Sequence, residues 1–215
     1  MHNPFKVVEM FEENLCEYTG APYTITTDSC TDALFLALKY HKKMKGLVIS
    51  DRSAVDEITI PARTYLSVPQ SIIQAGYRVN FVDMKWQGMY NLNPTFVWDA
   101  SKRFTSGMWN DLAPPSDAAP MMCLSFHHKK ILNIGKGGAI LTNNKDAAEW
   151  LKKSRYEGRT GSMSYHQDDI TDLGWNMYMT PEQAARGMTL LSALPKHNAD
   201  QIEDPDYRDL REFTA

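Results

Sequence analysis

Short apolar segments typical of strands alternate with segments of helical periodicity along the first half of the chain. Helical spacing is found in residues 31–41 and again in residues 65–75. The segments with strand character on either side of them are Tyr23–Thr27, Glu57–Pro61, Tyr77–Val82 and Thr95–Trp98. A helix that links two strands crosses one face of the sheet and leaves the strands parallel. The chain is therefore predicted to be an α/β protein, with three layers (α/β/α) around a mostly parallel sheet.

Three more helices are predicted from their periodicity or from their first residues. Apolar residues at helical spacing predict an opening helix over residues 4–18. Asn144 is predicted to cap a helix that runs to Tyr156. The segment Thr180-Pro-Glu-Gln183 has the form of a capping box with proline at the first helical position, so it predicts a helix that runs to Leu194.

The polar stretches between these elements are predicted to be loops. They are residues 42–56, 105–119 and 158–173. Residues 1–195 are assigned to one domain. Residues 196–215 form a charged C-terminal tail with little apolar content, which we expect to be poorly ordered.

Composition excludes several classes of protein. The 215 residues carry a net charge of −3 with scattered Lys and Arg, so no nucleic-acid surface is expected. No apolar run reaches the ~20 residues that span a bilayer, and the N-terminus does not resemble a signal peptide. Cys16, Cys30 and Cys123 have no metal-ligand spacing. We expect reduced thiols in a cytoplasmic protein without a bound metal.

The segment from Ser125 to Thr142 is the strongest pointer to chemistry. An apolar strand ends at Ser125, and Lys130 follows five residues later. A glycine turn then leads into a second short apolar strand, Gly138–Thr142. This layout suits an amine that is held rigidly in a pocket beside a hydroxyl that binds an anion. Most lysines are solvated surface charges, so the prediction depends on the companions of Lys130.

Two further segments place polar groups next to predicted strands. Asp99 ends an apolar strand, and a buried carboxylate needs a partner. Ser29 and Thr31 lie between a strand and a helix start, where unpaired N–H groups and the helix dipole favour anions. For each of the three residues, capping of a helix is an alternative that is at least as good when the residue is judged alone.

Seven motifs occur in the same order as in a known family. They are Phe11-Glu-Glu with Tyr18-Thr-Gly20, Ser29-Cys-Thr-Asp-Ala-Leu34, Ile60-Pro-Ala-Arg-Thr-Tyr65, Ala75-Gly-Tyr-Arg-Val-Asn-Phe-Val-Asp83, Trp98-Asp-Ala-Ser101, Ser125-Phe-His-His-Lys-Lys130 with Gly135-Lys-Gly-Gly-Ala139, and Gly174-Trp-Asn176 with Met179-Thr180 and Gln183-Ala-Ala185. From about Phe11 to Leu194, the chain resembles the DegT/StrS family of sugar-nucleotide aminotransferases. These enzymes depend on pyridoxal 5'-phosphate (PLP) and have the aspartate-aminotransferase-like fold.

The resemblance implies PLP as the cofactor and assigns the roles closest to the chemistry. Lys130 would form an imine with PLP and later move a proton between the carbons of cofactor and substrate. Lys129 is the rival in a shifted register. Asp99 would keep the pyridine nitrogen protonated. Tyr65 would stack on the ring, with a core aromatic as the alternative.

The remaining cofactor contacts are also implied by the resemblance. The backbone at Cys30, together with Thr31 and Ser125, would bind the phosphate. Lys102 stands where the family has a glutamine that contacts the phenolic oxygen of PLP. Asn176 would reach the phosphate from the other subunit, which implies a homodimer with shared active sites.

Departures from the family pattern concern mainly the substrate side. Lysine at position 130 favours transamination over the sugar dehydration of relatives that carry histidine there. Cys30 replaces a glycine of the phosphate cup, and Lys136 replaces an acidic residue. The segment between Asp83 and Trp98 is short, and the C-terminal small domain is largely missing after Leu194. These losses predict a more open substrate pocket.

The features together predict a PLP-dependent aminotransferase of reduced activity. It would move an amino group from an amino-acid donor such as glutamate to a keto-sugar nucleotide, in polysaccharide or deoxyaminosugar biosynthesis. The alternative is a truncated relative that binds PLP or a partner subunit without turnover.

Overall fold

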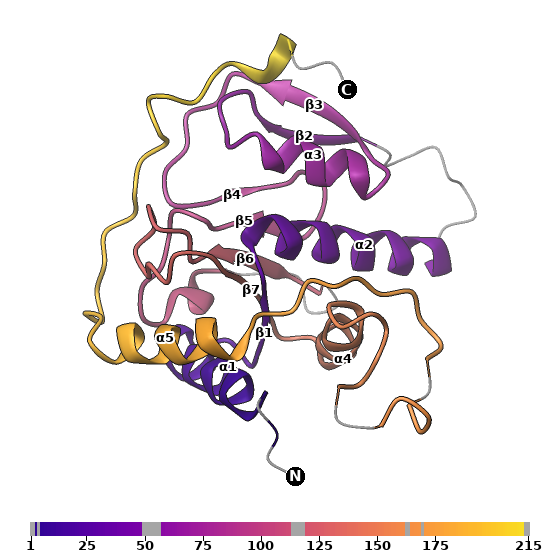
Figure 1. Ribbon diagram of the computed structural model, residues 1–215. Helices are drawn as coiled ribbons and strands as arrows, with labels where there is room; N and C mark the ends of the chain where they lie inside the picture. Colours follow the sequence, from indigo (N-terminus) through magenta and orange to yellow (C-terminus); the bar gives the residue numbers. More distant parts are fainter. Residues whose placement is uncertain are drawn as a thin grey trace.

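The computed structural model describes residue 3 and residues 5–48, 57–112, 119–161, 164–168 and 170–212, with the backbone alone for residues 45–48. Figure 1 shows the sheet between two groups of helices. The helices are α1 (Lys6–Thr19), α2 (Cys30–Val48), α3 (Ser67–Gln74), α4 (Lys145–Ser154) and α5 (Pro181–Ser192), with two 3₁₀ helices at Met108–Asp111 and Leu210–Glu212. The strands are β1 (Tyr23–Thr27), β2 (Glu57–Pro61), β3 (Arg78–Val82), β4 (Tyr90–Asn91), β5 (Val97–Asp99), β6 (Met121–Ser125) and β7 (Gly138–Thr142). No helix in the described part of the chain is long and apolar enough to cross a membrane.

The five-stranded sheet is mixed, in the order β1-β7-β6-β5-β4. β5 is parallel to β6, whereas β7 is antiparallel to both β1 and β6, and β4 is antiparallel to β5. The prediction of a mostly parallel sheet is therefore wrong. Residues 92–96 and 126–137 join consecutive strands without a helix, and such a direct connection returns the chain antiparallel. The separate pair β2–β3, which α3 connects, is parallel as predicted.

Helices cover both faces of the sheet, as the three-layer prediction requires. Side chains alternate along β6: Met121 and Cys123 belong to the core formed with α2, α3 and α4, whereas Met122 and Leu124 belong to the core formed with α1 and α5. All four side chains are at most 1% exposed. Each fully buried methionine or leucine contributes roughly 1.5–3 kcal/mol, so β6 is held from both faces.

The predicted helix starts at Asn144 and Thr180 are confirmed. The Asn144 side chain accepts a hydrogen bond from the Ala147 N–H at 2.8 Å and caps α4. At α5, the Thr180 N–H donates to the Gln183 side chain at 2.7 Å, and the Gln183 N–H donates to the Thr180 hydroxyl at 3.4 Å. These reciprocal bonds satisfy N–H groups that have no acceptor inside the helix.

Several boundaries differ from the predictions. α1 ends at Thr19, because Gly20 adopts a left-handed conformation with φ of 80°. Residues 42–48 continue α2, although their polarity predicted a loop; lysine and methionine are good helix formers. β4 escapes prediction because two residues carry no readable alternation. Residues 49–56, 113–118, 162–163 and 169 of the predicted loops lie outside the described residues.

The segment after α5 lies along the sheet, contrary to the expectation of a poorly ordered tail. Figure 1 shows it running from α5 along the outside of the sheet to the side of β2 and β3. Its backbone is bound at several points: the Ser106 N–H donates to Lys196 O at 2.8 Å, the Gln201 N–H to Lys102 O at 2.9 Å, and the Gly88 N–H to Gln201 O at 3.0 Å. Backbone groups make these contacts, so a low apolar content does not reveal them.

Candidate functional site

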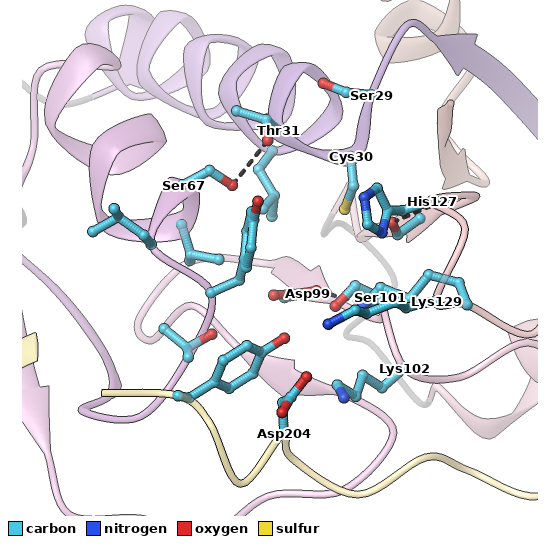
Figure 2. A pocket seen from close by; sticks show the side chains of 18 of the residues that line it. Ser29, Cys30, Thr31, Ser67, Asp99, Ser101, Lys102, His127, Lys129 and Asp204 are labelled. Atoms are coloured by element: carbon cyan, nitrogen blue, oxygen red, sulfur yellow. Dashed lines mark hydrogen bonds between the residues drawn. The ribbon is translucent and has the colours of Figure 1, made fainter. Parts of the chain in front are cut away.

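A cavity of about 1140 Å³ opens where three strands end. β1, β5 and β6 run in the same direction, since β7 is antiparallel to both β1 and β6 and β5 is parallel to β6. Their carboxyl ends bring Ser29, Asp99 and Ser125 to the cavity wall. Open α/β sheets bind ligands at this edge. Figure 2 shows the start of α2 on one side of the cavity, Lys102 and Asp204 on the other, and Asp99 between them.

Asp99 is a buried carboxylate with a hydrogen bond to each oxygen. It is 2% exposed, and it accepts from the Ser101 N–H at 2.9 Å and from the Tyr90 hydroxyl at 3.0 Å. The Tyr90 hydroxyl also lies 2.7 Å from the Thr64 hydroxyl. Burial and the charge of Asp99 raise the pKa of Tyr90 well above its usual value, so Tyr90 remains a donor. Residues 100–107 contain no helix in the described structure, so the capping alternative for Asp99 is wrong.

Lys130 is a largely buried amine in the same cavity. Burial lowers its pKa from the ordinary value of 10.5, although the Asp99 carboxylate acts in the opposite direction. A lowered pKa increases the neutral fraction of the amine, which is the nucleophilic form. Lys129 also lines the cavity but is exposed. Burial therefore favours Lys130 over its neighbour, as the spacing from Ser125 predicts.

The start of α2 forms a side of the cavity suited to an anion. The Ser29 hydroxyl accepts from the Asp32 N–H at 3.1 Å and donates to the Asp32 carboxylate at 2.8 Å, so Ser29 caps α2 as its alternative predicts. The Thr31 hydroxyl instead donates to the Ser67 hydroxyl at 2.8 Å (Figure 2). N–H groups in the first turn of a helix have no acceptor within that helix, and they favour a negative ligand.

The glycine turn brings β7 against this helix start. A Cβ on Gly138 would lie 2.4 Å from the Ser29 carbonyl carbon and 2.5 Å from the Cys30 nitrogen, so a side chain there would separate the two elements. Cys30 lines the cavity, and its pKa is raised well above the usual value by burial and by the charge of Asp99. The thiol therefore stays protonated and unreactive. Lys136 also lines the cavity, and its ammonium pairs with Asp28.

The other predicted contacts have different surroundings. Tyr65 lines the cavity and is 57% exposed, so the alternative of a core aromatic is wrong. The Lys102 ammonium lies 5.5 Å from the centre of the Tyr207 ring. Asn176 lies apart from the cavity lining, and its side chain donates to the Glu157 carboxylate at 3.0 Å. The role of Asn176 across a subunit interface stays a prediction.

Two parts of the site were not predicted from the sequence. Tyr90 orients Asp99 from the two-residue strand β4, which is too short to show alternation, and its hydroxyl lies beside that of Thr64, which lines the cavity. Residues 204–212 supply a second wall that includes Tyr207. Its one signal is an aromatic residue in an otherwise charged segment.

Comparison with known proteins agrees with this geometry. Residues 2–109 and 116–207 match the model of the DegT/DnrJ/EryC1/StrS aminotransferase family. The chain belongs to this family. Its members are PLP-dependent sugar aminotransferases. The resemblance drawn from the seven motifs is thereby confirmed.

Curated relatives are distant in sequence and longer. The UDP-4-amino-4,6-dideoxy-N-acetyl-beta-L-altrosamine transaminase of Campylobacter jejuni is 24% identical over 236 aligned positions, which cover 93% of this chain and 60% of that protein. GDP-perosamine synthase of Caulobacter vibrioides is 26% identical, with coverage of 88% and 57%. The chain thus spans about 60% of the length of the curated relatives it matches.

Solved structures share the fold. AtS13 from Actinomadura melliaura superposes with a TM-score of 0.69 at 19% identity, covering 87% of this chain and 60% of that one. The Bacillus subtilis protein ntda, whose structure contains the cofactor PMP, superposes with a TM-score of 0.63 at 22% identity and coverage of 87% and 48%. The fold is therefore that of PLP aminotransferases over part of their length.

Proposed function

We propose that the chain is a PLP-dependent aminotransferase that takes an amino group from an amino acid such as glutamate and delivers it to a keto-sugar nucleotide. The observation that carries the proposal is the presence of the largely buried Lys130 and the buried Asp99 in one cavity. Family membership and the transaminase among the relatives support it.

The described residues fit PLP group by group. The start of α2 and the hydroxyl of Ser125 suit the phosphate, and Asp99 suits a protonated ring nitrogen. Lys130 suits the aldehyde, and the exposed ring of Tyr65 suits a position against the flat cofactor. Bound PLP supplies an electron sink for the carbon that loses a proton.

The neighbours of Asp99 prepare it to hold a ring nitrogen. Tyr90 and Ser101 each donate a hydrogen bond to one carboxylate oxygen, which offsets the cost of burying the charge and fixes its orientation. A carboxylate that is already oriented stabilises a cation without rearranging during the reaction. Asp99 would thus keep the proton on the ring nitrogen through the reaction.

Lys130 would move the proton at the substrate carbon. Its lowered pKa means that more of the amine is unprotonated and able to accept a proton. The turn that carries Lys130 is fixed, because its N–H donates to His127 O at 2.9 Å and the Phe126 N–H donates to Gly137 O at 2.9 Å. A fixed turn keeps the amine at one place in the cavity.

A reduction experiment tests the proposal at a single residue. The protein is mixed with PLP, its visible absorption is recorded, and borohydride is added before peptide mass spectrometry. We expect PLP to be fixed to Lys130. The Lys129→Ala variant should behave like the parent, whereas Lys130→Ala should show no fixed PLP. Labelling of Lys129 in the parent, or no labelling at all, would refute the assignment.

A second candidate is a relative that binds PLP or a partner subunit without turnover. It is favoured by the coverage of about 60% of the relatives and by Cys30 and Lys102 in the cavity wall. The two candidates differ in the response of the PLP-loaded protein to glutamate. Conversion of bound PLP to pyridoxamine phosphate, with release of 2-oxoglutarate, excludes the second candidate. Stable PLP with every amino donor excludes the first.

We further propose a homodimer with shared active sites. Asn176 supports it, because this side chain is exposed and lies apart from the cavity of its own chain. Mixing Lys130→Ala protein with Asn176→Ala protein offers a direct test. If the sites are shared, the mixture should recover part of the glutamate half-reaction that each variant lacks alone. A mixture no more active than its parts, in a protein shown to exchange subunits, would refute the sharing.

A further inference from the structure

The second wall of the cavity is strongly acidic. Residues 203–212, called the acidic strap from here on, follow the part of the tail that is bound along the sheet. The strap has five carboxylates and two guanidiniums: Glu203, Asp204, Asp206, Asp209 and Glu212, with Arg208 and Arg211. Four of the five acidic residues line the cavity, together with Tyr207, Arg208 and Leu210.

The strap contacts cationic groups in the cavity and next to it. Its Tyr207 ring lies under the Lys102 ammonium at 5.5 Å, and its Asp209 carboxylate lies 3.6 Å from the Arg63 guanidinium. Asp204 is close enough to Lys130 for its charge to oppose the loss of the Lys130 proton. Figure 2 shows Asp204 near Lys102, across the cavity from the start of α2. Carboxylates thus lie on the side of the cavity opposite the start of α2, where an anion is expected to bind.

Few contacts hold the strap in this position. Among the described residues, one backbone hydrogen bond joins it to the rest of the protein, from the Leu210 N–H to Ala62 O at 2.9 Å. Leu210 is its buried anchor at 9% exposure. One oxygen of Glu203 is buried without a hydrogen-bond partner in the described structure, which disfavours the position of the strap against the cavity. A segment with few buried contacts opens at low cost in free energy.

We propose that the acidic strap competes with the anionic part of the substrate for the cavity, so that a phosphate-bearing sugar enters as the strap leaves. The proposal rests on the proposed function, which supplies a sugar nucleotide as substrate. A diphosphate and the strap carboxylates are both negative, and they would meet the same lysines in one cavity. Like charges at short range repel, so the presence of one disfavours binding of the other. The strap therefore sets the affinity for the substrate.

Neutralising the strap tests this competition. In the variant Asp204→Asn, Asp206→Asn and Asp209→Asn, the shapes are kept and three negative charges are removed. Binding of uridine diphosphate is measured by calorimetry on the full chain, with and without PLP. We expect several-fold tighter binding than in the parent and a smaller change with ionic strength. Unchanged or weaker binding, or no binding by the variant, would overturn the proposal.

A matched control carries the same change in net charge on a distant surface. Glu13→Gln, Glu17→Gln and Glu149→Gln are exposed positions on α1 and α4, outside the cavity lining. This variant should bind uridine diphosphate as the parent does. Equal gains in both variants would mean that net charge alone is responsible, and would overturn a role for the strap.

A second measurement does not depend on charge substitution or on catalysis. Hydrogen exchange at the amides of Tyr207 and Leu210 should become faster when uridine diphosphate binds, because the strap leaves the cavity. Leu210→Ala, which removes the anchor and leaves all charges, should tighten the binding of uridine diphosphate as well. Slower exchange would show that the strap closes over the ligand, which contradicts competition. These results stand apart from labelling of Lys130 by PLP, so the two proposals can fail separately.

Discussion

The two walls of the cavity are built in different ways. The fixed wall, formed by residues 29–31, Asp99 and residues 125–130, belongs to the sheet and to the helix packed on it. Strand pairing and side-chain hydrogen bonds hold its parts. The acidic strap has one backbone hydrogen bond to the rest of the described protein. The fixed wall, where the cofactor is proposed to bind, is therefore preorganised. The acidic strap, on the proposed substrate side, is held more weakly.

The largest effect is expected at the centre of the fixed wall. Lys130→Arg keeps a positive charge in the cavity but removes the primary amine that combines with PLP and transfers the proton. We expect the rate of the glutamate half-reaction to fall by roughly 10²–10⁴-fold, measured from the absorption of the PLP-loaded protein in single-turnover experiments. Lys129→Arg is the matched control. Retention of the parent's rate in Lys130→Arg would remove the distinction between the two walls.

The pH dependence of PLP attachment sharpens the assignment of Lys130. Burial lowers the pKa of Lys130 below its ordinary value of 10.5, so the unfolded chain binds this proton more tightly than the folded chain. Stability from this group therefore rises with pH between the lowered pKa and 10.5. The rate at which PLP attaches to Lys130 should also rise about tenfold per pH unit up to the lowered pKa. Above that pKa the rate should become constant, before pH 10.5 is reached. Stopped-flow absorption at constant ionic strength measures it, and a rise that continues past 10.5 would contradict a lowered pKa.

Asp99→Asn should come next in magnitude. The amide has one acceptor oxygen, so it keeps only one of the hydrogen bonds from Ser101 and Tyr90, and it loses the charge that holds a protonated ring nitrogen. We expect a loss on the order of 10²-fold in the half-reaction, with PLP still fixed to Lys130 by borohydride. Tyr90→Phe, which keeps the charge and removes one donor, should cost less, about tenfold. The reverse order of the two variants would show that orientation matters more than charge.

Gly138→Ala tests the close packing of β7 against the start of α2, which supports the fixed wall. The new Cβ would lie 2.4 Å from the Ser29 carbonyl carbon, so β7 or the start of α2 must shift. We expect a loss of about 1–3 kcal/mol in the free energy of unfolding, measured by urea denaturation, and weaker binding of PLP. Gly135→Ala is a comparison at a site where the Cβ meets no atom within 4 Å but the backbone φ is +98°. Gly138 itself does not have a left-handed φ, so a loss there is assigned to the close approach, and an unchanged free energy of unfolding in Gly138→Ala would contradict it.

The sequence predicts the fixed wall better than the strap for a physical reason. β1, β2 and β7 have the bounds that were predicted, because each is a short segment that contains β-branched residues. Short motifs likewise predicted Lys130, Asp99 and Ser125 as site residues. The structure brings the three together in one cavity. Tyr65, Lys102, Cys30 and Thr31 line the same cavity.

What escaped prediction depends on contacts between distant parts of the chain. The insertion of β7 between β1 and β6 is decided by the pairing of whole strands, and local periodicity does not report it. The strap is bound by backbone groups such as the Leu210 N–H, which any residue except proline provides. Asn176 lies outside the cavity of its own chain, and its predicted contact with the phosphate in another subunit stays a prediction.

The smallest effect is expected in the strap itself. Tyr207→Leu removes the ring beneath the Lys102 ammonium, a contact worth roughly 0.5–1 kcal/mol at a partly exposed site. Loss of that contact loosens the strap, so uridine diphosphate should bind about two- to fivefold more tightly, while labelling of Lys130 by PLP stays unchanged. Tyr165→Leu, at an aromatic residue that is 66% exposed and outside the cavity lining, is the control. Loss of PLP labelling in Tyr207→Leu would place the strap in the cofactor site and erase the division between the two walls.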